Sequence, residues 1–299
     1  MLPGMVVKPR VAIVGAGNFG TGLAFALHRA GYAIDAVVAR ARGGSLQKAR
    51  TLAKRIGARA TIDLSAVRAE LIWICVPDSS IGRLAGALAD QTKWNGKIAV
   101  HSSGALTSDE LSVLRERGAA VASVHPLMTF VRGMKTLSAR PALTELLKGV
   151  PFAVEGDAPA LRCARRVVRD LGGHAYLIRK EDKAAYHAWA TFASPLFTAL
   201  LATTERVATL AGVSRKSARQ RMIPILQQTL ANYAAFGAAE AFSGPIVRGD
   251  LDTVRRHLQV LSGVPAAREV YLELARAALQ FLPVKHKKVL QRVVDSSRS

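Results

Sequence analysis

The stretch that decides the fold lies near the start of the chain and reads R-V-A-I-V-G-A-G-N-F-G, residues 10–20. Its apolar run predicts a buried strand, and the residues from Asn18 to Ala30 predict the helix that follows. Gly15, Gly17 and Gly20 form G-x-G-x-x-G, which allows a tight turn, close approach of a diphosphate, and close helix–strand packing. Because the helix N-terminus also favours phosphate, the pattern predicts a dinucleotide site. The alternative is a merely glycine-tolerant turn.

The end of the second predicted strand, Ala33 to Ala39, indicates which dinucleotide is bound. An acidic residue about 20 positions after the glycines would bind the ribose hydroxyl of NAD. This chain has Arg40 there, with Arg42 two residues later, while Asp35 lies inside the strand and too early to reach the ribose. A guanidinium group donates paired hydrogen bonds to a phosphate. We therefore expect NADP rather than NAD, the alternative being that both arginines are ordinary surface charges.

The length and composition allow a two-domain globular chain. It has 299 residues, half of them hydrophobic, yet no run approaches the roughly 18 uncharged apolar residues of a membrane span. Residues 1–8 lack a signal-peptide pattern, so we expect a cytoplasmic protein with no membrane partner. Cys75 and Cys163 predict no disulfide framework. The histidines have no acidic or thiol partners at metal-ligand spacing, so no metal site is expected.

The chain carries a formal net charge of +21, and residues 1–60 hold ten Lys and Arg against one acid. A positive field at this end favours an anionic cofactor. Binding to nucleic acid is the rival explanation. We do not expect it, because the charge is spread along the chain, aromatic residues make up only 6%, and no nucleic-acid motif is present.

Strand-like and helix-like segments alternate through the first 180 residues, which predicts a parallel, doubly wound α/β sheet of the Rossmann-like kind. Ligands bind at the carboxyl ends of such strands, where the chain places Asp78-Ser79, His101-Ser102-Ser103 and His125. Beyond Glu181 the strand signals stop and alanine-rich helical periodicity begins. We therefore expect a dinucleotide-binding domain over residues 1–180 and a separate all-α domain over residues 181–299, with Pro195 kinking its first helix.

Several polar residues could carry chemistry. Lys183 and His187 are spaced i, i+4 on one helix face, and Ser194 returns near that face. A lysine and a histidine beside a cofactor cleft could move a proton to or from a substrate oxygen, although an exposed helix face with this pattern is common. His125 follows a strand, so it either reaches the ligand edge or bonds to backbone. Arg248 could neutralise an anionic group.

The motifs G-A-G-N-F-G (15–20), C-V-P-D-S-S (75–80), H-S-S-G-A-L (101–106), H-P-L-M-T-F (125–130), K-A-A-Y-H (183–187) and G-P-I-V-R-G-D (244–250) together resemble the bacterial Rossmann-like and DUF2520 family. That family is similar in layout to ketopantoate reductase, pyrroline-5-carboxylate reductase and the β-hydroxyacid dehydrogenases. The resemblance implies an NADP-binding domain followed by a helical, dimerising domain, and it names no substrate.

These observations lead us to expect an NADP-dependent oxidoreductase that acts on a small carbonyl, hydroxy acid or imine, the substrate carrying an anionic group. We expect a homodimer formed through the helical domain. The alternative is a non-catalytic NADP-binding sensor. The expected catalytic residues are Lys183, His187 and His125; cofactor-binding residues are Gly15, Gly17, Asn18, Phe19, Gly20, Arg40, Arg42, Val76, Pro77 and Ser102; substrate-binding residues are Ser103, Ser194 and Arg248.

Overall fold

A computed structural model of the chain describes residues 7–91, 93–131 and 146–297. Contacts between residues divide it into two compact units, Met1–Thr191 and Phe192–Ser299. We refer to them as the sheet unit and the helical unit. The last strand ends at Leu177, and α7 (Lys183–Thr191) still belongs to the sheet unit.

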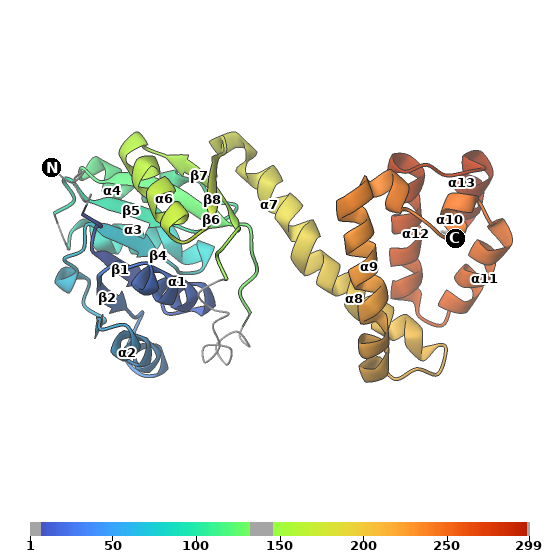
Figure 1. Cartoon of the computed structure of the whole chain (residues 1–299), viewed down its shortest axis with the longest axis horizontal. Coiled ribbons are helices and arrows are strands. Elements are labelled where there is room, and N and C mark those ends of the chain that lie inside the picture. Colours follow the sequence, from blue (N-terminus) through green and yellow to red (C-terminus); the bar gives the residue numbers. More distant parts are fainter. Residues whose placement is uncertain (1–6, 92, 132–145, 298–299) are drawn as a thin grey trace. The chain divides into compact units, whose positions relative to one another are not determined.

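Within the described residues, eight strands form one sheet in the order β3-β2-β1-β4-β5-β6-β7-β8 (Figure 1). The order reverses at β1, as expected of a doubly wound sheet, and the first six strands are parallel. The strands are β1 (Val11–Val14), β2 (Ile34–Val38), β3 (Arg59–Thr61), β4 (Leu71–Ile74), β5 (Ile98–His101), β6 (Ala120–Pro126), β7 (Pro151–Gly156) and β8 (His174–Leu177).

The direction of the last two strands corrects the expectation of a fully parallel sheet. β7 pairs antiparallel with β6, and β8 is parallel to β7, so both run against the first six strands. A parallel neighbour requires a crossover connection, usually a helix. Residues 132–145 of the connection between β6 and β7 lie outside the described residues.

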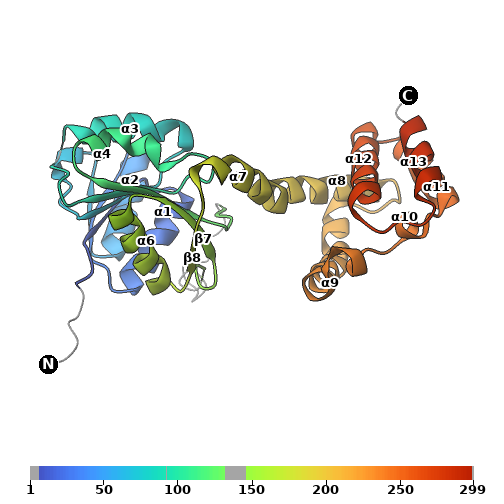
Figure 2. The same ribbon diagram turned by 90° about the horizontal axis from the view of Figure 1, so that it is seen from above.

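Helices cover both faces of the sheet, as Figure 2 shows. Every residue of β1 is buried because Val11 and Ile13 face one layer while Ala12 and Val14 face the other. The first layer contains α1 (Asn18–Arg29), α2 (Gly44–Arg55) and α6 (Ala158–Asp170). The second contains α3 (Ile81–Ala89) and α4 (Ser112–Glu116). This packing fixes the carboxyl ends of the parallel strands as one shared edge.

The helical unit begins with a π-helical turn, Phe192–Leu196, which contains Pro195. Pro195 offers no backbone N–H, so a regular α-helical turn cannot include it without loss, and the wider turn accommodates it. The core is built from α11 to α13, with Val254, Leu258, Leu272 and Leu290 buried. The helices are α8 (Phe197–Thr209), α9 (Arg215–Ala241), α10 (Pro245–Arg248), α11 (Leu251–Leu261), α12 (Pro265–Phe281) and α13 (Lys287–Ser296).

Among the helices of the described ranges, we find none that combines the length and the apolar character required to cross a bilayer.

Candidate active site

The turn after β1 contains three glycines, and at two of them no other residue would fit. Gly15 has φ 109°, and a Cβ atom on it would overlap the carbonyl oxygen of Cys75. A Cβ atom on Gly20 would overlap the carbonyl oxygen of Gly15. Gly17 differs, because a Cβ atom there would meet nothing within 4 Å. Gly15 and Gly20 are therefore required by the fold, whereas Gly17 leaves the backbone at its position without a side chain and exposed.

The N-terminus of α1 is open to an anion. Gly17 is its N-cap, so no side chain of the described residues caps the first turn, which also contains no acidic residue. The first N–H groups of a helix lack intrahelical partners and carry the positive end of its dipole. The side chains of Asn18 and Phe19 both contact Phe130: the Asn18 amide donates to the Phe130 carbonyl at 3.2 Å, and the Phe19 and Phe130 rings meet edge-on.

The loop after β2 is cationic and free of competing acid. Arg40 and Arg42 are exposed, and neither forms an ion pair within the part of the chain that the structure describes. The adjoining α2 has Gly43 as N-cap, with no acid in its first turn. Asp35, the one acid of β2, faces elsewhere and accepts from the Arg68 N–H at 2.8 Å. The loop thus fits a phosphate group, as expected for NADP.

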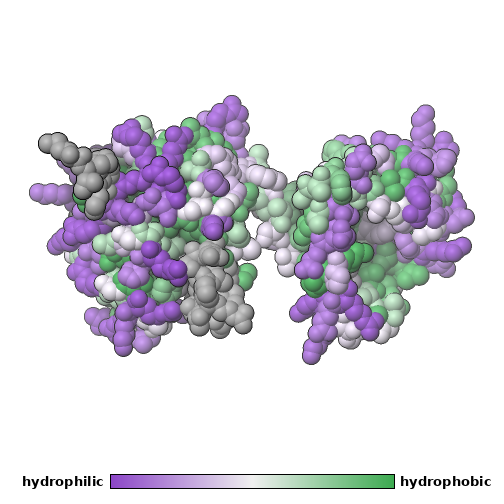
Figure 3. All heavy atoms as spheres, viewed as in Figure 1, coloured by the Kyte–Doolittle hydropathy of each residue, from purple (hydrophilic) through white to green (hydrophobic). Residues whose placement is uncertain are grey.

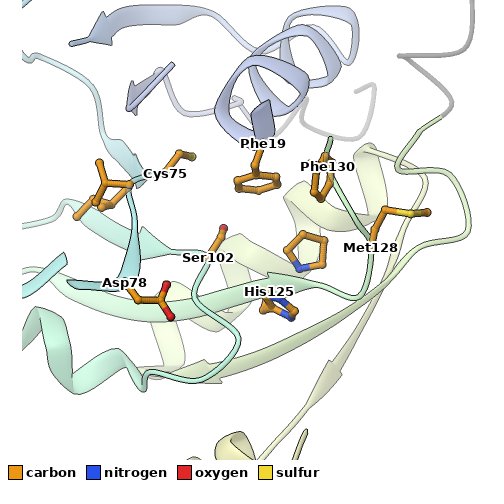
Figure 4. Close-up of a pocket in the computed structure, with 10 residues that line it drawn as sticks. Phe19, Cys75, Asp78, Ser102, His125, Met128 and Phe130 are labelled. Atoms are coloured by element: carbon orange, nitrogen blue, oxygen red, sulfur yellow. The ribbon is translucent and has the colours of Figure 1, made fainter. Parts of the chain in front are cut away.

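A cavity of about 180 Å³ opens at the carboxyl ends of β4, β5 and β6 (Figure 4). Its walls are mostly apolar, and its polar groups come from Asp78, Ser102 and His125. The predicted cofactor residue Val76 lies on the wall, and Pro77 directly follows it. The lining residues are Phe19, Ile74, Cys75, Val76, Asp78, Ser102, His125, Pro126, Met128 and Phe130.

The two serines after β5 have different roles in this geometry. Ser102 lines the cavity, and its hydroxyl accepts a hydrogen bond from the Trp73 indole at 2.8 Å. Ser103 is buried, and its hydroxyl donates to an Asp78 carboxylate oxygen at 2.7 Å while accepting from the Leu106 N–H at 2.9 Å. The Ser103 hydroxyl, predicted to bind substrate, is therefore engaged in holding its own loop.

Lys183 lies at the start of α7 and is 1% exposed. Its ammonium donates to the Ser123 hydroxyl at 2.6 Å and to the Ser103 carbonyl at 3.1 Å. Burial lowers the pKa of Lys183 to about 8, against the opposing influence of the Glu155 and Asp78 carboxylates. Lys183 is not among the residues that line the cavity; its ammonium holds the backbone of the loop after β5 through the Ser103 carbonyl.

His125 lies near the end of β6 and lines the cavity. Its Nδ1 lies 2.8 Å from the Tyr186 hydroxyl. Burial, with the charges of Lys183 and His187, lowers the pKa of His125 to about 4. The His187 ring lies 6.2 Å from the His125 ring, and a Cβ atom on Gly104 would overlap both. The structure thus brings together Lys183, His125 and His187.

Ser194 and Arg248 belong to the helical unit, so their expected contacts with substrate stay predictions. Ser194 lies in the π-helical turn, and Arg248 is the exposed last residue of α10. The neighbouring Asp250 caps α11 and accepts from the Thr253 N–H at 3.2 Å.

Residues 5–126 match the model of the Rossmann-like domain, and residues 150–278 match the model of the domain of unknown function DUF2520. The chain combines a Rossmann-like domain with a DUF2520 domain. The family expected from its motifs is thereby confirmed. No curated protein matches the chain.

Solved structures share the fold of this Rossmann-like and DUF2520 chain. A candidate NADP oxidoreductase from Bacteroides fragilis has a TM-score of 0.73 at 23% identity, covering 90% of this chain and 97% of its own. A protein from Thermotoga maritima has a TM-score of 0.65 at 23% identity, covering 97% and 100%. A reductive aminase from Aspergillus terreus, in complex with NADPH and ethyl-5-oxohexanoate, has a TM-score of 0.64 at 15% identity, covering 96% and 100%. At these identities the likeness establishes the fold.

Two residues that contact the predicted catalytic side chains of the Rossmann-like and DUF2520 chain were not predicted from the sequence. Ser123 is a polar residue inside the apolar run of β6, and this break in the pattern was the available signal. Tyr186 lies within K-A-A-Y-H, three residues after Lys183, where an aromatic residue reads as core packing. Only the contacts with Lys183 and His125 reveal what these two hydroxyl groups do.

Proposed function

We propose that the chain is an NADP-dependent oxidoreductase that transfers hydride to or from a small carbonyl, hydroxy acid or imine substrate. The observation that carries the proposal is the N-terminus of α1 behind Gly17, which no described side chain caps, together with Arg40 and Arg42 at the next strand end, which form no ion pair with any described residue. Proteins with the same fold support it, since they include a candidate NADP oxidoreductase and an NADPH-bound reductive aminase.

The residues present fit this cofactor. The backbone from Gly15 to Gly20 would hold the diphosphate, and Arg40 and Arg42 would hold the 2′-phosphate. Val76, Pro77 and Ser102 would border the nicotinamide, because they lie where β4 and β5 end. When bound, NADPH supplies the hydride.

We propose different roles for His125 and Lys183, two of the three predicted catalytic residues. His125 is the group that would meet the reacting oxygen or nitrogen, because it lines the cavity. Lys183 would act through its charge and through Ser103 and Ser123, since its ammonium is enclosed by them. His187 would hold the Gly104 turn beside His125, and Arg248 stays our proposal for an anionic substrate group.

Coenzyme titration of the full chain tests the proposal. Isothermal titration should show binding of NADPH at least about tenfold tighter than NADH, since a 2′-phosphate gains charge-assisted hydrogen bonds. The double variant Arg40→Ala/Arg42→Ala should lose this preference and leave NADH affinity nearly unchanged. Arg162→Ala/Arg165→Ala, the same loss of charge on the exposed face of α6, is the matched control. Failure of the native chain to bind either coenzyme would overturn the proposal.

Catalysis is tested by NADPH oxidation against a panel of 2-keto acids, 3-keto acids and imines. Turnover of any one class supports the oxidoreductase. Tight NADPH binding without turnover across the panel would instead support a sensor that reports NADP.

We propose further that the chain forms a homodimer through the helical unit. Its helix α9 exposes large apolar side chains, and Figure 3 shows apolar atoms at the surface of that unit. A long helix that is apolar on several sides is normally buried by a partner. The exposed apolar residues of α9 are Ile223, Ile225, Leu230, Tyr233 and Phe236.

A further inference from the structure

The strongest unassigned feature of the sheet unit is the pair formed by His125 and Tyr186. Strand β6 brings His125 to the cavity, and helix α7 brings Tyr186 against it. The Tyr186 hydroxyl lies 2.8 Å from His125 Nδ1, and the two rings meet edge-on at 5.5 Å. Tyr186 is 7% exposed, so this hydrogen bond is shielded from water. It occupies one ring nitrogen of His125 and leaves Nε2 for the cavity.

The direction of this hydrogen bond decides what the cavity sees. A neutral imidazole carries one proton, so a bond donated to Nδ1 places that proton on Nε2, and the reverse bond leaves Nε2 as an acceptor. Both partners are neutral at working pH: burial raises the pKa of Tyr186 and lowers the pKa of His125 to about 4. The charged or titratable groups that face His125 are Lys183, His187, Asp78 and His101.

The surroundings of Tyr186 favour donation to His125. If the Tyr186 oxygen accepted from Nδ1–H, its own buried proton would need another acceptor, and a buried donor without one is costly. The neighbouring Tyr176 hydroxyl interacts with the Tyr186 hydroxyl and helps to raise its pKa, and this buried hydroxyl has no other partner among the described residues. The Tyr176 proton therefore needs the Tyr186 oxygen as its acceptor, which leaves the Tyr186 proton for His125. His125 Nδ1 is the acceptor that the structure provides.

We propose that Tyr186 is a positioning residue that donates its hydroxyl proton to His125 Nδ1 and so presents Nε2–H to the substrate. The pair then selects a substrate whose reacting group is a neutral acceptor, a carbonyl oxygen or an imine nitrogen with a free lone pair. A protonated iminium offers no lone pair and is disfavoured. His125 polarises the double bond by hydrogen bonding; as the carbon takes up the hydride, the oxygen or nitrogen takes up the Nε2 proton, and His125 regains a proton from water. The assignment of a reacting group rests on the proposed function, whereas the tautomer does not.

The tautomer can be read directly by NMR of the full chain with ¹⁵N-labelled histidine, with His125→Gln used to assign its signals. We expect His125 to carry its proton on Nε2 between pH 6 and 8. In Tyr186→Phe, which keeps the ring and removes only the hydroxyl, the signals should shift toward a mixture of the two tautomers. Tyr176→Phe removes the neighbouring hydroxyl instead and should leave the His125 proton on Nε2. A proton on Nδ1 in the native chain, or no change in Tyr186→Phe, would overturn the proposal.

Kinetics separate this inference from the proposed function. With a substrate from the panel, Tyr186→Phe should lower kcat about tenfold and leave the KM for NADPH within about twofold, since the coenzyme loop is untouched. NADPH turnover together with an Nδ1–H tautomer would reject the inference alone. An Nε2–H tautomer in a chain that binds no coenzyme would reject the proposed function alone.

Discussion

Lys183 shows how a single residue is tuned by its surroundings. A buried ammonium loses the solvation of water, and two hydrogen-bond acceptors with two nearby carboxylates offset part of that loss. The remaining imbalance favours the neutral amine and lowers the pKa to about 8. Lys183 is thus mostly protonated at neutral pH yet loses its charge within an accessible range.

This shift predicts a pH dependence of both activity and stability. If the charge of Lys183 stabilises negative charge on the substrate oxygen, the reduction rate should fall as the pH rises through about 8. In Lys183→Met this fall should vanish. Unfolding returns the pKa of Lys183 from about 8 to its ordinary value of 10.5. At pH 7 the buried charge therefore lowers the free energy of unfolding by on the order of 3 kcal/mol. This cost is relieved as the pH rises from about 8 to 10.5. Lys183→Met should therefore unfold no earlier than the native chain in denaturant at pH 7.

The control for this prediction is Lys180→Met, which removes an ammonium that is bonded to Asp109 just before α7. It should keep the native pH profile. A break near pH 8 that persists in Lys183→Met would assign the titration to another group.

At the scale of elements, the two helices that follow β1 and β2 share one property. Both α1 and α2 have a glycine N-cap and no acidic residue in the first turn. Because β1 and β2 are neighbouring parallel strands, the positive ends of both helices lie at the carboxyl edge of the sheet, where a dinucleotide would place its phosphates. A side chain that capped either helix would compete with those phosphates.

Gly17→Asp tests this competition. The residue has φ −70° and open space around it, so an aspartate fits without strain and can cap α1. We expect an unchanged or higher Tm, because an aspartate cap contributes about 1 kcal/mol. NADPH affinity should fall at least about tenfold through repulsion of the diphosphate. Calorimetry of unfolding and coenzyme titration measure both quantities on one sample.

Gly20→Ala provides the contrast, since its Cβ atom would overlap the Gly15 carbonyl oxygen and should lower the Tm instead. Undiminished NADPH binding by Gly17→Asp would place the diphosphate elsewhere.

At the scale of the molecule, α9 is the element that the single chain leaves unfinished. Of its 27 residues, Ala218 is buried, whereas Tyr233 and Phe236 are 60% and 66% exposed. Exposed apolar area of this extent marks an interaction surface in a folded chain. A second copy is the partner that the proposed homodimer supplies.

Light scattering after gel filtration tests the homodimer. We expect the native chain to have twice the mass of one chain, and Leu230→Glu/Tyr233→Glu to shift it toward monomer, because two buried carboxylates would oppose association. Leu177→Glu changes a comparably exposed apolar residue on β8 and should leave the mass unchanged. A native chain that elutes as a monomer at micromolar concentration would contradict the homodimer.

The sequence by itself determined the elements and the order in which they follow one another. The glycine spacing, the buried strands and the helical periodicity act over a few residues, so the first six strands, α1 and the longer helices after residue 181 were predictable; the short helix α10 was not. The position of Arg40 and Arg42 was predictable for the same reason, because β2 ends at Val38 and both arginines come directly after it.

Tertiary structure alone decided how distant residues meet. The antiparallel direction of β7 was not predictable from the local pattern, because the residues of a strand do not specify the direction in which it pairs with a distant neighbour. The contacts of Lys183 with Ser103 and Ser123 span 80 and 60 residues, and that of His125 with Tyr186 spans 61. Hydrogen bonds across such separations exist only once the sheet has placed its strand ends at a common edge, so the chemistry of these groups is a property of the fold.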